Sequence, residues 1–118
     1  MATLNAKLTL SGNDLTSDAL NMTVSDAVTV SKSVEMKRIA LSTTAKNILP
    51  AASYTKAFVY VKNVDTNISI KLVKSEGGDV YMDVGPGEFG FFPWDTAVDL
   101  FADAASGTPT IEVGIFEV

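Results

Sequence analysis

The sequence predicts an all-β protein, an antiparallel sandwich or barrel of about eight strands that forms one domain over residues 1–118. Three observations lead to this prediction. Apolar and polar residues alternate along most of the chain, which is the pattern of strands with one buried face. Turn-forming residues interrupt the alternation at short intervals, about every 8 to 14 residues. Convincing helical patterns are missing, and a parallel sheet would need crossover helices.

The first segment, residues 3–10, places its leucines on one side of an extended strand. A polar turn at residues 11–14 ends it. Residues 20–24 repeat the alternation, and residues 27–30 either continue that strand or form a separate one. We expect residues 1–12 to be an edge strand or an arm that contacts a neighbouring molecule.

The middle of the chain predicts three further strands. Residues 36–41 contain good helix formers, but they lack an N-cap signal and run directly into Ser42–Thr44, which favours a strand. Residues 56–63 are apolar on both faces and predict a central strand. Residues 68–72 alternate after a turn, so we expect them to form a hairpin with the central strand.

Glycine and proline divide the last third of the chain into four strands. Turns are predicted at residues 76–79, 85–87 and 106–109, because glycine tolerates the backbone angles that tight turns need. The strands between them cover residues 80–84, 89–94 and 98–101, and the last strand covers residues 111–115.

The strand at residues 89–94 is the aromatic one. Alternation places Phe89 and Phe91 on one side and Phe92 on the other. The strand carries four aromatic rings, the fourth being that of Trp94, and we expect at least two of the four to pack in the core. Phe92 or Trp94, carried past the sheet edge by Pro93, is a candidate anchor of a subunit contact, since aromatic residues are enriched at interface centres. A sugar-stacking platform is a weaker interpretation because the chain has one tryptophan.

Composition and charge exclude several classes of function. The chain is 47% apolar and 19% charged, as packed globular proteins are, and its net charge of −5 without a basic cluster argues against nucleic-acid binding. No apolar run approaches the ~20 residues that a membrane-spanning helix needs. The first residues lack the pattern of a signal peptide, so we expect synthesis in a host cytoplasm without export.

Catalytic and metal-binding motifs are weak. The absence of histidine and cysteine excludes Ser-His-Asp and Cys-His catalysis and the zinc sites built on those ligands. The carboxylates of Asp79, Asp83 and Glu88 lie close in sequence, but turn and solvent-facing roles explain them better than glycoside hydrolysis. We therefore predict no enzyme, no catalytic residue and no cofactor.

Two loop motifs also favour structural roles. Asn63, Asp65 and Asn67 have the alternate spacing of calcium ligands, but the expected glycine and distal acid are missing, which favours turn capping. Gly85–Gly87 is too short for a phosphate-binding loop and lacks its lysine. The sequence predicts no metal site.

Three stretches, residues 58–63, 85–93 and 107–117, resemble small virion proteins of tailed bacteriophages, including those that infect cyanobacteria. The resemblance covers about the C-terminal half and consists of strand-and-turn rhythm with a Gly-Pro-Gly-Glu-Phe block. It implies a jelly-roll-like sandwich that decorates the outside of an icosahedral head, often as a homotrimer, bound to the major capsid protein. Neck, tail and fibre proteins share this β-rich style.

The sequence thus predicts a non-enzymatic capsid decoration, or cement, protein located on the virion surface. A carbohydrate- or receptor-binding module and a neck, tail or fibre component are the alternatives. We expect residues 3–10 or the C-terminal strand to lie at a sheet edge and to contact a neighbour. The candidate interface residues are Leu4, Leu8, Leu10, Phe92, Trp94, Ile115 and Phe116.

Overall fold

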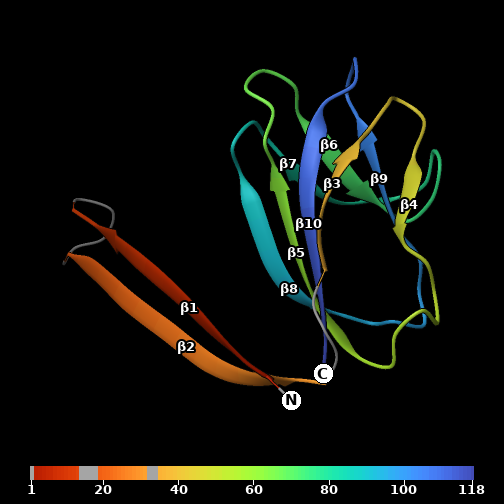
Figure 1. Cartoon of the computed structure of the whole chain (residues 1–118). Coiled ribbons are helices and arrows are strands. Elements are labelled where there is room, and N and C mark those ends of the chain that lie inside the picture. The colour runs from red at the N-terminus through yellow and green to blue at the C-terminus, as the bar shows by residue number, and fades with distance from the viewer. Residues whose placement is uncertain (1, 14–18, 32–34) are drawn as a thin grey trace.

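The computed structural model describes residues 2–13, 19–31 and 35–118. Within these ranges the chain forms ten strands in antiparallel pairs and no helix, which confirms the all-β prediction. Eight of the strands form a sandwich of two four-stranded sheets, and the other two form a hairpin. Figure 1 shows that the hairpin projects from the sandwich. The strands are β1 (Ala2–Gly12), β2 (Leu20–Val30), β3 (Glu35–Ala40), β4 (Lys46–Leu49), β5 (Ala57–Asn63), β6 (Ile70–Val73), β7 (Val80–Val84), β8 (Phe89–Trp94), β9 (Leu100–Ala104) and β10 (Thr110–Glu117).

The sandwich has jelly-roll topology. One sheet has the order β3-β10-β5-β8 and the other has the order β4-β9-β6-β7. The pairs β3–β10, β4–β9, β5–β8 and β6–β7 are nested along the chain, and successive pairs belong alternately to the two sheets. A long antiparallel ribbon rolled up in this way gives the two Greek keys of a jelly roll. The predicted eight-stranded jelly-roll sandwich is therefore confirmed, and the hairpin is an addition to it.

The core lies between the two sheets and follows from the alternation in the sequence. Along β5, buried side chains alternate with half-buried ones, so Val59 and Val61 point inward while Phe58 and Tyr60 point outward. The inward residues of β6 and β9 meet them from the other sheet. The largest completely buried apolar side chains are Leu41, Leu49, Val59, Val61, Ile70, Leu72, Leu100 and Ile111.

Two expectations about strand pairing need correction, and one strand was missed. The predicted hairpin between β5 and β6 is wrong, because β5 pairs with β10 and β8 while β6 pairs with β7 and β9 in the other sheet. The C-terminal strand is not at an edge, since β10 lies between β3 and β5. The short strand β4 was not predicted. Alternation shows which residues of a strand share a face, but it does not fix which strand lies beside it.

The loop between β5 and β6 carries the chain from one sheet to the other, and Asn63 holds it in place. Asn63 is completely buried, and its Nδ2 donates to the carbonyl oxygens of Ile68 at 2.8 Å and Val84 at 3.1 Å. Its Oδ1 accepts from the N–H of Asp65 at 3.0 Å. The Asp65 carboxylate in turn accepts from the N–H groups of Asn67 and Ile68, both at 2.8 Å, which lowers the pKa of Asp65. These bonds confirm turn capping as the role of Asn63 and Asp65.

We expect Asn63→Ala to lower the free energy of unfolding by about 3 kcal/mol, because it leaves buried backbone groups without a partner. Asn67→Ala is the matched control. The Asn67 side chain is exposed and donates only to Thr66 Oγ1, at 3.2 Å, so this change should cost less than about 0.5 kcal/mol. Urea unfolding followed by circular dichroism measures both. Equal stability of the two variants would contradict the role given to Asn63.

Candidate interaction surface

The hairpin of β1 and β2, which we call the arm, is amphipathic along its whole length. The register runs without a break from Ala2 opposite Val30 to Gly12 opposite Leu20, so residues 20–30 are one strand. Directly opposed residues share a face in an antiparallel pair. The pairs Leu4–Val28, Leu8–Val24 and Leu10–Met22 therefore form one face, which is apolar except for Asp26 opposite Ala6. The other face consists of polar pairs, among them Thr3–Thr29, Lys7–Ser25 and Thr9–Thr23.

The apolar face of the arm is covered at its base and uncovered at its tip. Val28 and Val30 at the base are 9% and 3% exposed, whereas Leu8 and Val24 near the tip are 47% and 56% exposed. The base is also held by the N–H of Ser31, which donates to the carbonyl oxygen of Glu117 at 2.9 Å. Figure 1 shows the arm diverging from the sandwich toward its tip. The arm is therefore anchored at one end only.

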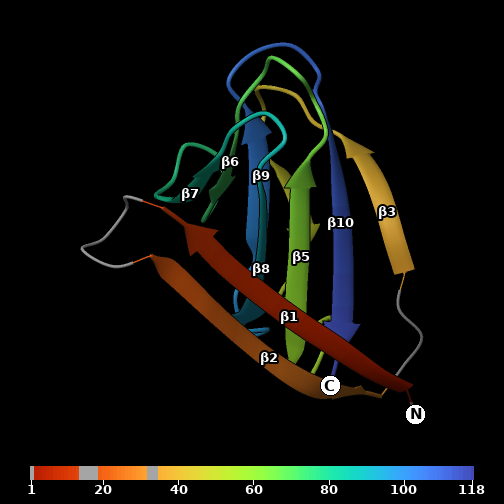
Figure 2. The ribbon, with the colours of Figure 1, turned by 90° about the vertical axis from the view of Figure 1, so that its left-hand side faces the viewer.

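The arm faces the outward side of the β3-β10-β5-β8 sheet, which we call the outer face (Figure 2). Three phenylalanines cluster there. The Phe58 and Phe91 rings stack with centroids 5.5 Å apart, and Phe116 meets Phe91 edge-on at 6.1 Å. Phe89 beside them is 65% exposed. Contiguous exposed aromatic surface of this kind marks interaction sites on soluble proteins.

A cleft of about 640 Å³, the arm cleft, separates the arm from the outer face. Aliphatic side chains of the arm line one wall, and the phenylalanines line the other. Only three lining side chains carry a polar group, namely Lys7, Asp26 and Tyr60. The volume is within the range of ligand-binding clefts, but such a lining favours apolar material over a polar substrate.

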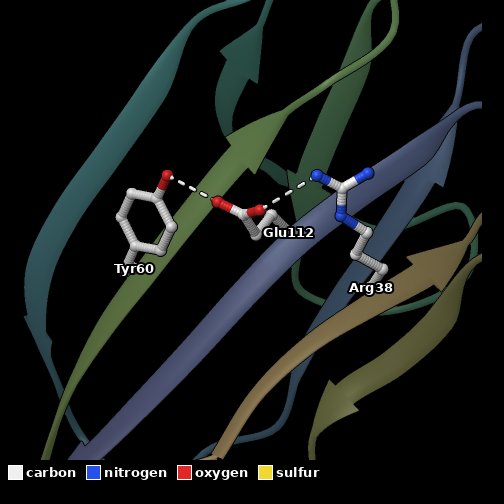
Figure 3. Close-up of polar contacts among 3 residues, drawn as sticks. All are labelled: Arg38, Tyr60 and Glu112. Atoms are coloured by element: carbon white, nitrogen blue, oxygen red, sulfur yellow. Dashed lines mark hydrogen bonds and ion pairs between the residues drawn. The ribbon is translucent and has the colours of Figure 1, made fainter.

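The polar part of the outer face is a hydrogen-bonded row across three strands (Figure 3). The Tyr60 hydroxyl on β5 donates to Glu112 Oε1 on β10 at 3.1 Å, and Arg38 on β3 lies 3.5 Å from Glu112 Oε2. Burial raises the pKa of the Tyr60 phenol, and the hydrogen bond to Glu112 and its negative charge raise it further. Since the Arg38 side chain is 68% exposed, this ion pair contributes little to stability.

The candidate interface residues divide into two groups. Leu4, Leu8 and Leu10 lie on the apolar face of the arm, and Phe116 lies on the outer face. Phe92, Trp94 and Ile115 instead point inward and pack against the core. The indole N–H of Trp94 donates to the carbonyl oxygen of Val98 at 3.1 Å. These three partly buried side chains support the sandwich, and the role of Phe92 or Trp94 as an anchor of a subunit contact stays a prediction.

Sequence reasoning passed over the two rings that are exposed, Phe89 and Phe91. The alternation does place them together on one side of β8, as the structure shows. It does not reveal whether that side or the side of Phe92 faces the core. Pro93 offers the clue that β8 is an edge strand, because proline lacks the N–H that an inner strand needs, and β8 is indeed at the edge.

Several residues that were considered for catalysis or phosphate binding lie in a turn or on an exposed strand face. Glu88 Oε1 accepts from the N–H of Gly85 at 2.5 Å across the turn, and Gly87 has a φ of 76°. Asp83 is exposed on β7, opposite Lys71. In the described ranges no group of three or more acidic residues is placed to hold a metal ion. The same ranges contain no helix of the length and apolarity that crossing a membrane requires.

Comparisons of the chain with protein family models, with curated proteins and with solved structures found no significant match. Its function must therefore be argued from the arm, the outer face and the cleft between them.

We expect the stability of the protein to fall above about pH 10, and Tyr60 to contribute to that fall. The folded chain holds the Tyr60 proton more tightly than the unfolded chain, because the pKa of this phenol is raised in the folded state. The unfolded state therefore gains relative stability as the pH rises through the ordinary tyrosine pKa toward the raised one.

Tyr60→Phe should reduce this alkaline loss while costing about 1 kcal/mol at pH 7 for the lost hydrogen bond. Glu112→Gln should also reduce the loss, because it removes the negative charge beside the phenol. Urea unfolding between pH 7 and pH 11 measures the effect. An alkaline loss of the same size in all three proteins would show that Tyr60 has no part in it.

Proposed function

We propose that this chain is a non-enzymatic structural protein of a virion, and that it decorates the outside of a capsid by binding the major capsid protein. The observation that carries the proposal is the arm, which is anchored at its base and exposes apolar side chains at its tip. An isolated two-stranded hairpin is marginally stable in water. An arm with an uncovered apolar face is therefore suited to contacts with other molecules.

The sandwich supplies what a decorating protein needs besides the arm. Among the residues that the structure describes, the buried side chains are apolar apart from Asn63 and Glu117, and such a core suits a stiff platform. The resemblance of residues 58–63, 85–93 and 107–117 to small virion proteins of tailed phages points to the same role. Virus capsid proteins are also among the proteins that use jelly rolls.

The arm cleft supports a structural role over a catalytic one. The titratable groups that line it are Lys7, Asp26 and Tyr60, and the Tyr60 hydroxyl is already donated to Glu112. Acid–base catalysis needs a donor and an acceptor within hydrogen-bond reach of one reacting group. Among the lining residues the apolar side chains outnumber these three groups.

The exposed rings Phe89 and Phe91 favour one alternative, a carbohydrate-binding module in which a sugar stacks on the outer face. Sugar recognition also requires hydrogen bonds to ring hydroxyls, and the lining of the arm cleft offers few groups for them. A glycan array separates the two functions, since a decorating protein should bind no glycan and a lectin should bind a defined set.

Capsid decoration predicts saturable binding of the purified chain to shells assembled from the major capsid protein of the same genome. Cosedimentation, followed by quantification of the two proteins, measures the stoichiometry. We expect a fixed ratio that reflects the symmetry of the shell. Absence of cosedimentation with intact shells would contradict the proposal.

Removing the arm should weaken this binding by at least about tenfold, or about 1.4 kcal/mol. Residues 31–118 retain all eight strands of the sandwich, so the shortened chain should keep its β-rich circular dichroism and unfold cooperatively. The matched control is Thr23→Ala on the polar face of the arm, which should bind shells as the unaltered chain does. Unchanged binding by the folded, armless chain would exclude the arm from the contact.

A further inference from the structure

We propose that the arm of one copy of this protein lies on the outer face of a second copy, and that the second copy returns the same contact. The arm cleft is then the opening that each copy offers to its partner. The inference rests on the proposed assembly role, but it concerns contacts between identical chains and requires no capsid.

The first argument is that both surfaces of the proposed contact lack cover within one chain. Near the tip of the arm, Leu8 and Val24 are about half exposed. On the outer face, Phe89 and Phe91 are 65% and 39% exposed. The two surfaces line opposite walls of the same cleft but diverge toward the tip, so the chain does not close them on each other.

The second argument is the reach of the arm. In Figure 2 the arm crosses the outer face obliquely, and its tip arrives at the side of the sandwich where β7 and β8 lie. β8 is an edge strand and carries Phe89 and Phe91. A second copy beside this edge meets the arm tip and the exposed rings together, and a two-fold axis between the copies makes both contacts identical.

The third argument is area. Each strand of the arm has 11 residues. The uncovered part of the apolar face is the five residue pairs from Leu8 opposite Val24 to Gly12 opposite Leu20. At about 3.3 Å per residue and about 10 Å for the width of two strands, it covers about 165 Å². A reciprocal contact buries two such faces and two matching sheet areas, about 660 Å² in total, which is the size of a weak contact that forms at high protein concentration.

The fourth argument is charge. The chain carries a net charge of −5, so two copies repel each other in general. The strands of the arm contain one acidic and one basic residue: Asp26, opposite Ala6, lies on the apolar face, and Lys7, opposite Ser25, lies on the polar face. The outer face carries Lys62, opposite Phe89, and the pair of Arg38 and Glu112, which gives it one net positive charge. The proposed contact thus brings the Asp26 carboxylate of one copy toward an outer face of opposite net charge on the other copy, where the repulsion between identical chains is offset.

The first experiment is sedimentation velocity with light scattering on the purified full-length chain. We expect the mass of a dimer at high concentration. Leu8→Asp on the arm and Phe89→Asp on the outer face should each weaken dimerisation at least about tenfold, because a symmetric contact loses the buried side chain twice. The matched control is Thr9→Asp on the polar face of the arm, which should dimerise normally.

Mixing the two defective variants tests the pairing itself. The Leu8→Asp and Phe89→Asp chains together regain one intact contact, an unaltered arm on an unaltered outer face, so the mixture should form more dimer than either variant alone. Normal dimerisation by Phe89→Asp alone would show that arm packs on arm, and would overturn the proposal. A monomeric unaltered chain would overturn it too.

Disulfide trapping distinguishes contact with a second copy from closure of the arm on its own sheet. The chain has no cysteine, so Val24→Cys combined with Phe89→Cys introduces the only two thiols. After oxidation we expect a disulfide between chains, seen as a dimer on a non-reducing gel. A disulfide within one chain would overturn the proposal. Capsid binding by a monomeric chain would refute the reciprocal contact and leave the proposed decoration role in place. A dimer that does not bind capsids would refute the decoration role and leave the reciprocal contact in place.

Discussion

The apolar layer between the two four-stranded sheets is the interaction on which the rest of the structure depends. Val59 and Val61 of β5 are completely buried there, and this fixes Phe58 and Tyr60 on the outer face, because neighbouring residues of a strand point to opposite sides. The same layer positions β10, where the carbonyl oxygen of Glu117 accepts the hydrogen bond from Ser31 that holds the base of the arm. The aromatic outer face and the direction of the arm are thus both consequences of the core.

The arm shows that the fold tolerates an apolar surface that it does not cover. Burial of apolar side chains near the base, Val28 and Val30, ties the hairpin to the sandwich, while the side chains toward the tip contribute little to the stability of a single chain. An eight-stranded sandwich with its own core can carry such an extension without losing its fold. The uncovered side chains contribute little to the stability of the isolated chain and are accessible to other molecules.

The sequence was sufficient for the fold class and for the faces of most strands, since these depend on local alternation. It correctly placed Phe89 and Phe91 together and Leu4, Leu8 and Leu10 together. It was insufficient for strand partners, as the wrong β5–β6 hairpin shows, because pairing depends on contacts between residues far apart in the chain. The sequence also did not show which side of β8 faces the core, because aromatic residues lie on both sides of this strand. The arm cleft follows from the angle between arm and sheet, and no local pattern encodes that angle.

The geometry of the arm also bears on whether contacts between copies give a closed assembly or an open-ended fibre. Both strands of the arm have a free edge, and free edges invite open-ended strand pairing. One face of the arm is lined by threonine and other polar residues, so only the opposite face gains by leaving water. When that face is used reciprocally between two copies, each arm meets one outer face and no apolar arm remains to recruit a third. A one-way contact would instead leave an uncovered arm on every assembly and favour growth into fibres. In the proposed dimer, closure by two-fold symmetry therefore leaves no apolar arm uncovered.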